Sequence, residues 1–101
     1  MIRMVPFVLE NGETVLGVEV KLPKTTLLSL STDRGYIMCG ALDVSLLNDK
    51  LRDREIIAGR AVGVRTLEEL IEAPLESVTH KAESLGIVAG MKGADALRLM
   101  L

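Results

Sequence analysis

The dipeptide Asn11-Gly12 is the feature that most constrains this chain, because it stands between two runs rich in β-branched and apolar residues. A type I′ turn needs positive φ at both central residues, and Asn-Gly adopts that conformation readily. The sequence therefore predicts an antiparallel hairpin. In the register of a two-residue turn, one face of the hairpin presents Leu16, Val18 and Val20 opposite Phe7, Val5 and Arg3, while Gly17, Glu19 and Lys21 alternate to the other face. This alternation predicts that the second strand is half-solvated.

A β-α-β unit is predicted downstream of a further strand, Thr26–Ser31. Residues 36–39 form a short apolar run between glycines, which is typical of a strand buried on both faces. Apolar residues at helical spacing follow, with Asp43 as a candidate N-cap, although a start near Gly40 fits equally well. Glu55–Val64 then returns as a strand, which predicts parallel pairing with the first.

The C-terminal third is predicted to be helical. Thr66 and Glu69 fit a capping box, in which the Thr66 hydroxyl accepts from the Glu69 amide and the Glu69 carboxylate accepts from the Thr66 amide. Pro74 suits the first turn of the next helix, and Gly86 suits the left-handed position just after its end. Ala94–Leu101 forms a last amphipathic stretch.

These elements predict one domain, residues 1–101, of the α+β (mixed α/β) class. An N-terminal antiparallel hairpin is joined to the β-α-β unit in a mixed sheet of about five strands, with helices packed on it. The length of 101 residues is common for one domain and leaves no room for two separate cores.

Composition narrows the range of partners. A net charge of −2 and an aromatic content of 2% disfavour nucleic acid, which requires cationic surfaces and stacking platforms. Uncharged runs fall short of the roughly 18 residues of a membrane span, and residues 1–6 lack the features of a signal peptide. One cysteine and one histidine allow no internal disulfide and no multi-ligand zinc site. We therefore expect a cytoplasmic protein with no membrane association, no metal and no cofactor.

The high content of hydrophobic residues predicts self-association. Hydrophobic residues make up 49% of the chain, and a domain of this size buries only about two-thirds of the surface that its unfolded chain exposes. Exposed apolar patches commonly mark interfaces, so the composition predicts a homo-oligomer. The alternative is a monomer with a well-filled core.

Cys39 is the candidate catalytic residue. A strand-Cys-Gly-helix order would place its sulfur near the free amides of a helix N-terminus, where positive charge lowers the pKa of a thiol. The alternative is a small buried hydrophobe. His80, the sole histidine, is the available base, but its helical position opposite the apolar stripe predicts a surface residue.

Two arginines suggest an anion site. In the strand predicted over residues 55–64, Gly59, Ala61 and Gly63 form a bare stripe that admits a close neighbour. Arg60 lies on the opposite face and needs a partner, either a carboxylate such as Asp43 or a bound anion. Arg65 precedes a helix N-terminus, where amides also receive anions. The candidate ligand-binding residues are Gly40, Asp43, Arg60, Arg65 and Thr66; the alternative is a structural ion pair beside an ordinary helix cap.

Four stretches resemble the YunC-like family of small bacterial and archaeal proteins of unknown function. They are residues 20–25, 35–43, 58–66 and 73–78, and the similarity spans nearly the whole chain. The resemblance implies a compact stand-alone α/β domain. The family has no established activity, so the resemblance supplies no catalytic residues.

Two functions remain open at this point. The first is a homo-oligomeric accessory or binding domain, favoured by the aliphatic excess and by the absence of nucleotide-binding, zinc-protease and nucleophile-elbow motifs from the sequence. The second is a small enzyme or a binder of anionic metabolites at Cys39, Asp43, Arg60 and Arg65. The sequence leaves open whether the protein is an enzyme.

Overall fold

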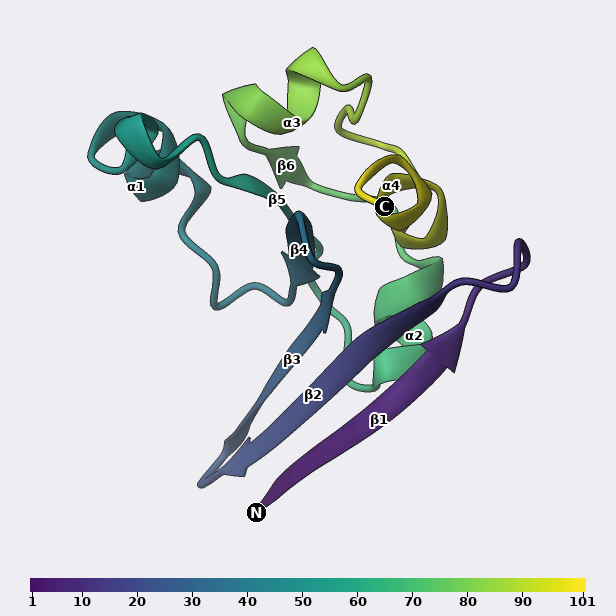
Figure 1. Ribbon diagram of the computed structural model, residues 1–101. Coiled ribbons are helices and arrows are strands. Elements are labelled where there is room, and N and C mark those ends of the chain that lie inside the picture. Colours follow the sequence, from purple (N-terminus) through teal and green to yellow (C-terminus); the bar gives the residue numbers. More distant parts are fainter.

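One six-stranded sheet runs through the molecule in the order β1-β2-β3-β4-β5-β6 (Figure 1). The computed structural model describes the backbone of residues 1–101 and every side chain except that of Arg52. The strands are β1 (Ile2–Val8), β2 (Thr14–Leu22), β3 (Thr25–Ser31), β4 (Gly35–Met38), β5 (Ile57–Arg60) and β6 (Ser77–Val78). The helices are α1 (Val44–Asp49), α2 (Leu67–Glu72), α3 (His80–Ser84) and α4 (Gly93–Leu99), with a 3-10 turn η1 (Arg52–Arg54) after α1.

The predicted fold class is confirmed. Neighbouring strands pair antiparallel except β4 and β5, which are parallel and connected through α1. The sheet has six strands rather than about five, because β6 adds to the free edge of β5.

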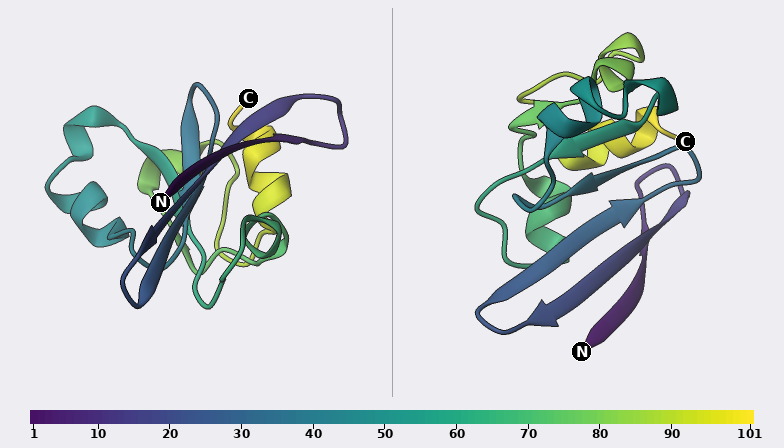
Figure 2. Two further views of the ribbon diagram at one scale, coloured as in Figure 1. Left: turned by 90° about the horizontal axis from the view of Figure 1, so that it is seen from below. Right: turned by 90° about the vertical axis from the view of Figure 1, so that its left-hand side faces the viewer.

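The two faces of the sheet have different cover. Helices α2 and α4 lie on one side and α1 lies on the other (Figure 2, left). We call the side under α2 and α4 the inner face and the opposite side the outer face. The inner face holds the main core, in which strand residues meet helix residues. Its fully buried large side chains include Val15, Leu28, Leu30, Ile37, Leu67, Leu70 and Leu97.

The predicted hairpin register is wrong by one residue. Phe7 pairs with Val15 instead of Leu16, and Val5 pairs with Gly17. The loop explains the shift, because Gly12 has φ +87° and Asn11 is not among the residues with positive φ, whereas a type I′ turn needs both. The Gly12 amide donates to the Leu9 carbonyl at 2.9 Å, so a turn followed by one left-handed residue joins the strands.

The register shift exchanges the two faces of β2. Val15, Gly17 and Glu19 are buried on the inner face, whereas Leu16 on the outer face is 38% exposed. Gly17 allows close packing there, because a Cβ at this position would lie 3.0 Å from the side chains of Leu67 and Phe7, which would have to shift.

The first strand of the β-α-β unit is less buried than predicted, and the second is shorter than predicted. In β4, Gly35 and Ile37 are buried but Tyr36 and Met38 are only half-buried, because α1 contacts β5 and leaves the outer face of β4 uncovered. The strand predicted over residues 55–64 ends at Arg60. The bare stripe survives at Gly59, where a Cβ would lie 2.8 Å from the Leu75 side chain.

The helix predicted from Pro74 is wrong over its first half. Residues 77–78 form β6, and α3 begins only at His80. Thr79 is the cause: its buried hydroxyl accepts from the Ala82 and Ala58 amides and donates to the Ile56 carbonyl at 2.7 Å. One side chain therefore caps α3 and ties it to β5.

Other predicted helix ends agree with the structure. Asp43 caps α1 by accepting from the Leu46 amide at 3.0 Å, and Gly86 has φ +89° just beyond α3. The capping box is half correct. Thr66 accepts from the Glu69 amide at 3.1 Å, but the Glu69 carboxylate accepts from the Arg65 amide instead of the Thr66 amide.

Candidate functional site

The outer face of β1 to β4 carries hydrocarbon and hydroxyl groups but no charge within these described strands. Figure 2 (right) shows β2 and β3 broadside, with no helix in front of them and α2 behind. Strand alternation and register place fifteen side chains on this face. They are Ile2, Met4, Pro6, Val8, Thr14, Leu16, Val18, Val20, Leu22, Thr25, Leu27, Ser29, Ser31, Tyr36 and Met38.

Exposure on this surface is greatest at the edge. Ile2 is 69% exposed, Met4 64% and Val8 71%. The charges of the same strands lie on the inner side, where Arg3 Nε approaches Glu19 Oε1 at 3.3 Å. The outer face is therefore an uncharged surface that is exposed along β1 and at the ends of β2 and is half-buried toward Val18, β3 and β4.

A polar cavity of about 560 Å³ lies at the carboxyl ends of β4 and β5. It is lined by the loop from Gly40 to Ser45, by Asn48 of α1, by Arg60, and by the segment Glu76–Val78. Three of the predicted ligand-binding residues, Gly40, Asp43 and Arg60, are brought together here. The carboxyl ends of parallel strands are a common place for ligands in open sheets.

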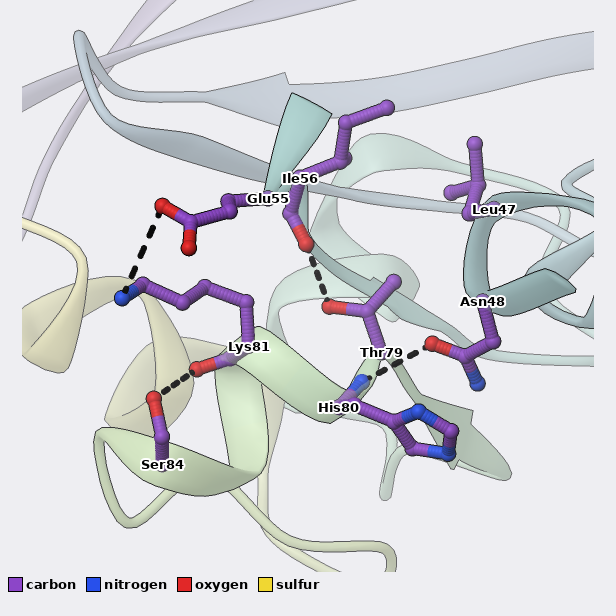
Figure 3. A pocket seen from close by; sticks show the side chains of 8 residues that line it. All are labelled: Leu47, Asn48, Glu55, Ile56, Thr79, His80, Lys81 and Ser84. Atoms are coloured by element: carbon purple, nitrogen blue, oxygen red, sulfur yellow. Dashed lines mark hydrogen bonds and ion pairs between the residues drawn. The ribbon is translucent and has the colours of Figure 1, made fainter. Parts of the chain in front are cut away.

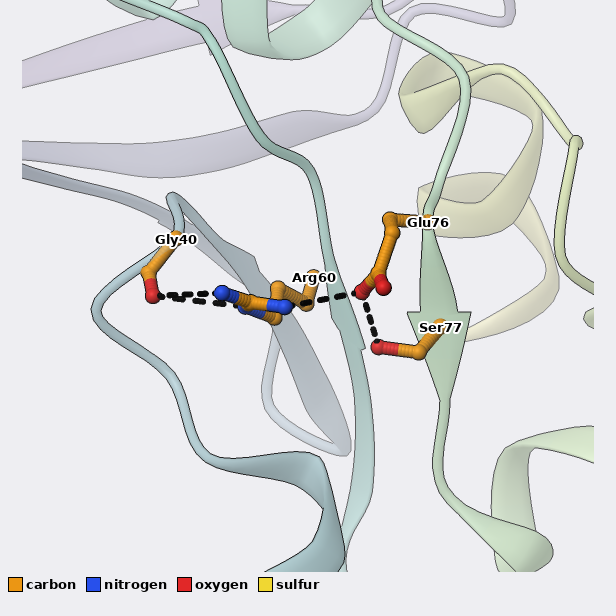
Figure 4. A network of polar contacts seen from close by, with 4 residues as sticks. All are labelled: Gly40, Arg60, Glu76 and Ser77. Atoms are coloured by element: carbon orange, nitrogen blue, oxygen red, sulfur yellow. Dashed lines mark hydrogen bonds and ion pairs between the residues drawn. The ribbon is translucent and has the colours of Figure 1, made fainter.

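Arg60 is engaged by its own protein (Figure 4). Its Nε and Nη2 donate to the Gly40 carbonyl at 3.3 and 3.1 Å, and its Nη1 donates to Glu76 Oε1 at 3.0 Å. The Ser77 hydroxyl donates to the same carboxylate oxygen at 2.7 Å. These donors, Ser77 first and Arg60 second, lower the pKa of Glu76. The carboxylate partner of Arg60 is thus Glu76 and not Asp43, which caps α1 instead.

The remaining predicted site residues lie outside this cavity. Cys39 is buried against β3: its Sγ accepts from the Leu28 amide at 3.5 Å, and α1 begins five residues later. The expected position of the thiol at a helix N-terminus is therefore wrong. Arg65 and Thr66 lie at the start of α2, where both are exposed. The Arg65 amide is already bonded to the Glu69 carboxylate at 2.7 Å.

A second cavity, of about 280 Å³, lies between α1 and α3 (Figure 3). The backbone amide of His80 donates to Asn48 Oδ1 at 2.9 Å, and Lys81 Nζ faces Glu55 Oε2 at 4.0 Å. His80 is exposed, which confirms the predicted surface position. Neither Cys39 nor any predicted ligand-binding residue lines this cavity.

Glu76 and Ser77 were missed by the sequence reasoning because they were assigned to a helix. The signal was present in the segment Pro74–Val78, where apolar Leu75 and Val78 flank two polar residues before the cap residue Thr79. A strand there places Glu76 beside Arg60, since Arg60 pairs with Ser77.

The mixed sheet, the β-α-β unit and the polar cavity define a small α+β domain, and within that class the chain has a clear family. It belongs to the family described as "Domain of unknown function (DUF1805)", whose model matches residues 38–100. The match includes the whole lining of the cavity beside Arg60.

Two individual proteins are similar over the full chain. The uncharacterized protein YunC of Bacillus subtilis (strain 168) is 56% identical over 101 residues, covering 100% of this chain and 99% of that protein. This agrees with the resemblance to the YunC-like family. The crystal structure of a protein of unknown function, TA1206 from Thermoplasma acidophilum, superposes with a TM-score of 0.87 at 24% identity. The match covers 100% of this chain and 94% of that one, and this likeness shows the fold. Among the described residues, no helix is long and apolar enough to cross a membrane.

Proposed function

We propose that this protein is a homo-oligomeric accessory or binding domain of the cytoplasm. The observation that carries the proposal is the uncharged outer face of β1 to β4, whose apolar side chains on β1 and at the ends of β2 are exposed. Contiguous apolar patches of more than a few hundred Å² are rare on proteins that act alone. Removing such surface from water contributes about 25 cal/mol per Å².

Charge and composition support self-association over other partners. The net charge of −2 provides no attraction for a phosphate backbone, and an aromatic content of 2% provides few stacking groups. The single cysteine supports a reducing compartment, since Cys39 is a free thiol.

The oligomeric state is measured by sedimentation velocity and by size-exclusion chromatography with light scattering across the micromolar range. We expect a species of at least twice the 10.9 kDa chain mass, with a monomer appearing only on dilution. A single 10.9 kDa species at every concentration would contradict the proposal.

A second candidate function is binding of a small anionic metabolite in the cavity beside Arg60, alone or as part of an enzyme. The cavity volume of about 560 Å³ is within the usual range for ligand sites, and Gly40, Asp43 and Arg60 all line it. Because Glu76 already holds the guanidinium, an anion has to compete with that carboxylate.

The competition gives this candidate a sharp test by thermal shift against phosphorylated and carboxylated metabolites. If Arg60 receives the anion, Glu76→Gln strengthens the response and Arg60→Gln abolishes it, whereas Glu72→Gln leaves it unchanged. Equal responses in all four proteins, or no response in any, would rule out Arg60 as the receptor.

A catalytic role for Cys39 would require this thiol, which is buried outside the cavity, to become accessible. A nucleophilic thiolate alkylates faster with iodoacetamide than a free thiol near neutral pH. Alkylation of the folded protein slower than that of the urea-unfolded chain would remove Cys39 from the candidate.

A further inference from the structure

The geometry points to a specific mode of association: two copies pack the outer faces of β1 to β3 against each other, about a two-fold axis near Val18. This inference rests on the proposed homo-oligomer and adds the surface, the partner and the packing mode. The occupant of the outer face is therefore a second copy of this chain.

The strands β1 to β3 place no charged side chain on the described outer face, which favours packing of this face against an identical face of a second copy. In a two-fold interface, each patch meets an identical patch, so any charge near the axis meets its own copy. Like charges brought together and desolvated are strongly unfavourable. Charge returns only beyond these strands. Glu13, Asp33 and Arg34 share a cavity with Leu16 and Ser31 at one end of the face. At β5, Arg60 lies in register with Met38 and is engaged by Glu76. The part of the face around Val18 can therefore meet its copy without charge repulsion at the axis.

The register places Val18 at the centre of this surface. Val18 is the middle residue of β2 and lies between Met4 of β1 and Ser29 of β3. Val20 and Leu16 flank it along the strand. Hydroxyl groups lie near strand ends in Thr14, Thr25 and Ser31, and beside Val18 in Ser29. Aliphatic side chains of β1 and β2 thus form the apolar part of the surface, and uncharged hydroxyls, mostly from β3, adjoin it, a combination that interfaces tolerate.

The area of the outer face suits a dimer. The strands β1, β2 and β3 have seven, nine and seven residues, and at a spacing of about 4.8 Å they make a face of roughly 360 Å² in flat projection. Two such faces cover roughly 720 Å² in projection, and the relief of their side chains brings the buried area toward the roughly 1,200 Å² at the lower end of stable interfaces.

Edge pairing between two β1 strands is disfavoured by Pro6. Met1 exchanges both backbone hydrogen bonds with Lys21, so the odd-numbered residues of β1 bond to β2 and the even-numbered ones face the open edge. Pro6 occupies one of these edge positions and has no N–H to donate. A strand added at this edge would lose a bond near its middle, whereas packing of outer faces uses no edge amide.

A lipid surface is a weaker match. Helices and loops that bind membranes combine apolar groups with cationic and tryptophan side chains. The outer face has neither of these within the described strands, and the chain contains no tryptophan.

Sedimentation equilibrium of wild type, Val18→Glu and Val88→Glu tests the surface. Val88 is 49% exposed and lies outside the outer face, in the segment between α3 and α4, so it is the matched control. We expect Val18→Glu to raise the dimer dissociation constant by about 100-fold or more, because two carboxylates meet near the axis. Val88→Glu leaves it within about twofold, and circular dichroism checks that both variants fold.

The possible outcomes distinguish failure of the proposed homo-oligomer from failure of the proposed interface. A monomeric wild type contradicts the proposed function together with this inference. An oligomeric wild type that Val18→Glu does not weaken overturns the inference alone. A monomer that co-sediments with phosphatidylcholine–phosphatidylglycerol vesicles identifies a lipid surface as the occupant and also overturns it.

Disulfide crosslinking tests the axis without adding charge. In a two-fold interface near Val18, a Val18→Cys side chain faces its own copy, so mild oxidation with copper phenanthroline yields a covalent dimer rapidly. Val88→Cys crosslinks only by collision, and wild type, with its buried Cys39, serves as the background. Crosslinking of Val18→Cys no faster than that of Val88→Cys, in a preparation that remains dimeric, would exclude the proposed axis.

Discussion

The two faces of β1, β2 and β3 are made by alternate residues of the same strands, yet they differ in almost every property. The inner face buries Leu28 and Leu30 under the helices and carries the charge pair Arg3 and Glu19 beside them. The outer face exposes Met4 and other aliphatic side chains and has no charge within the described strands. Helices of the same chain cover the inner face, whereas the apolar side chains of the outer face remain available to contact another molecule.

A single loop residue decides which side chains belong to which face. The left-handed Gly12 adds one residue to the hairpin loop, and a one-residue slip exchanges the two faces of a strand. The apolar set Leu16, Val18 and Val20 is thereby directed away from the helices. Hydrophobic residues on one face of a strand therefore predict that this face is covered. The register of the hairpin determines whether that face packs against the helices or remains available to another molecule.

The largest expected effect separates two leucines that lie close together on opposite faces. Leu30→Ala removes a fully buried side chain from the inner face, and we expect a loss of about 3 to 5 kcal/mol in the free energy of unfolding. Leu16→Ala, at a position 38% exposed, costs roughly 1 kcal/mol in dilute protein. Urea denaturation at one low protein concentration measures both. Equal losses of unfolding free energy in the two variants would contradict the difference in burial between the two faces.

A smaller effect is expected at the loop that sets the register. Gly12→Ala forces a Cβ into a backbone at φ +87°, although no atom within 4 Å opposes it. We expect a loss of about 1 kcal/mol from backbone strain. Urea denaturation measures the loss, and Glu13→Ala, a change at an exposed neighbouring position without positive φ, is the comparison. A neutral or stabilising Gly12→Ala would show that the loop does not hold this conformation.

The smallest effect is expected where charge returns to the outer face, at the ion pair of Arg60 and Glu76. The pKa of Glu76 is lowered in the folded protein, so its ionised form stabilises the fold above the pKa of the unfolded chain. This contribution disappears as the pH falls through the lower folded value.

Glu76→Gln tests this sign. We expect the variant to be less stable than wild type at about pH 7, and the difference to shrink at about pH 3, below the usual glutamate pKa of about 4.3. Ser77→Ala removes the leading hydrogen bond and shows the same trend more weakly. A difference between wild type and Glu76→Gln that is independent of pH would contradict the assigned cause.

Much of the fold is readable from local sequence signals, because those signals act through neighbouring residues. The hairpin site at Asn11-Gly12, the α1 cap at Asp43 and the end of α3 at Gly86 each depend on one or two side chains and the adjacent backbone. The parallel pairing of β4 and β5 follows from the element between them.

The predictions from sequence are wrong where contacts between residues far apart in the chain determine the local structure. Residues 74–79 have an apolar spacing that fits a helix, but pairing with β5 and the hydroxyl of Thr79 favour β6 followed by a short α3. That error removed Glu76 from the predicted site and left Arg60 without its true partner. The sequence therefore predicted Gly40 and Asp43 as loop residues of the cavity beside Arg60, but it did not predict the carboxylate that binds the guanidinium.

Methionine oxidation in the wild-type protein tests the central claim most directly, because Met4 is a natural probe on the outer face at 64% exposure. Met91, half-buried in the segment that precedes α4, is the internal control. Peptide mass spectrometry after hydrogen peroxide treatment gives the oxidation rate of each across a dilution series. We predict that Met4 oxidises severalfold more slowly above the dimer dissociation constant than below it, with Met91 unchanged. A Met4 rate independent of concentration, in samples that light scattering shows to be oligomeric, would contradict burial of the outer face between two copies.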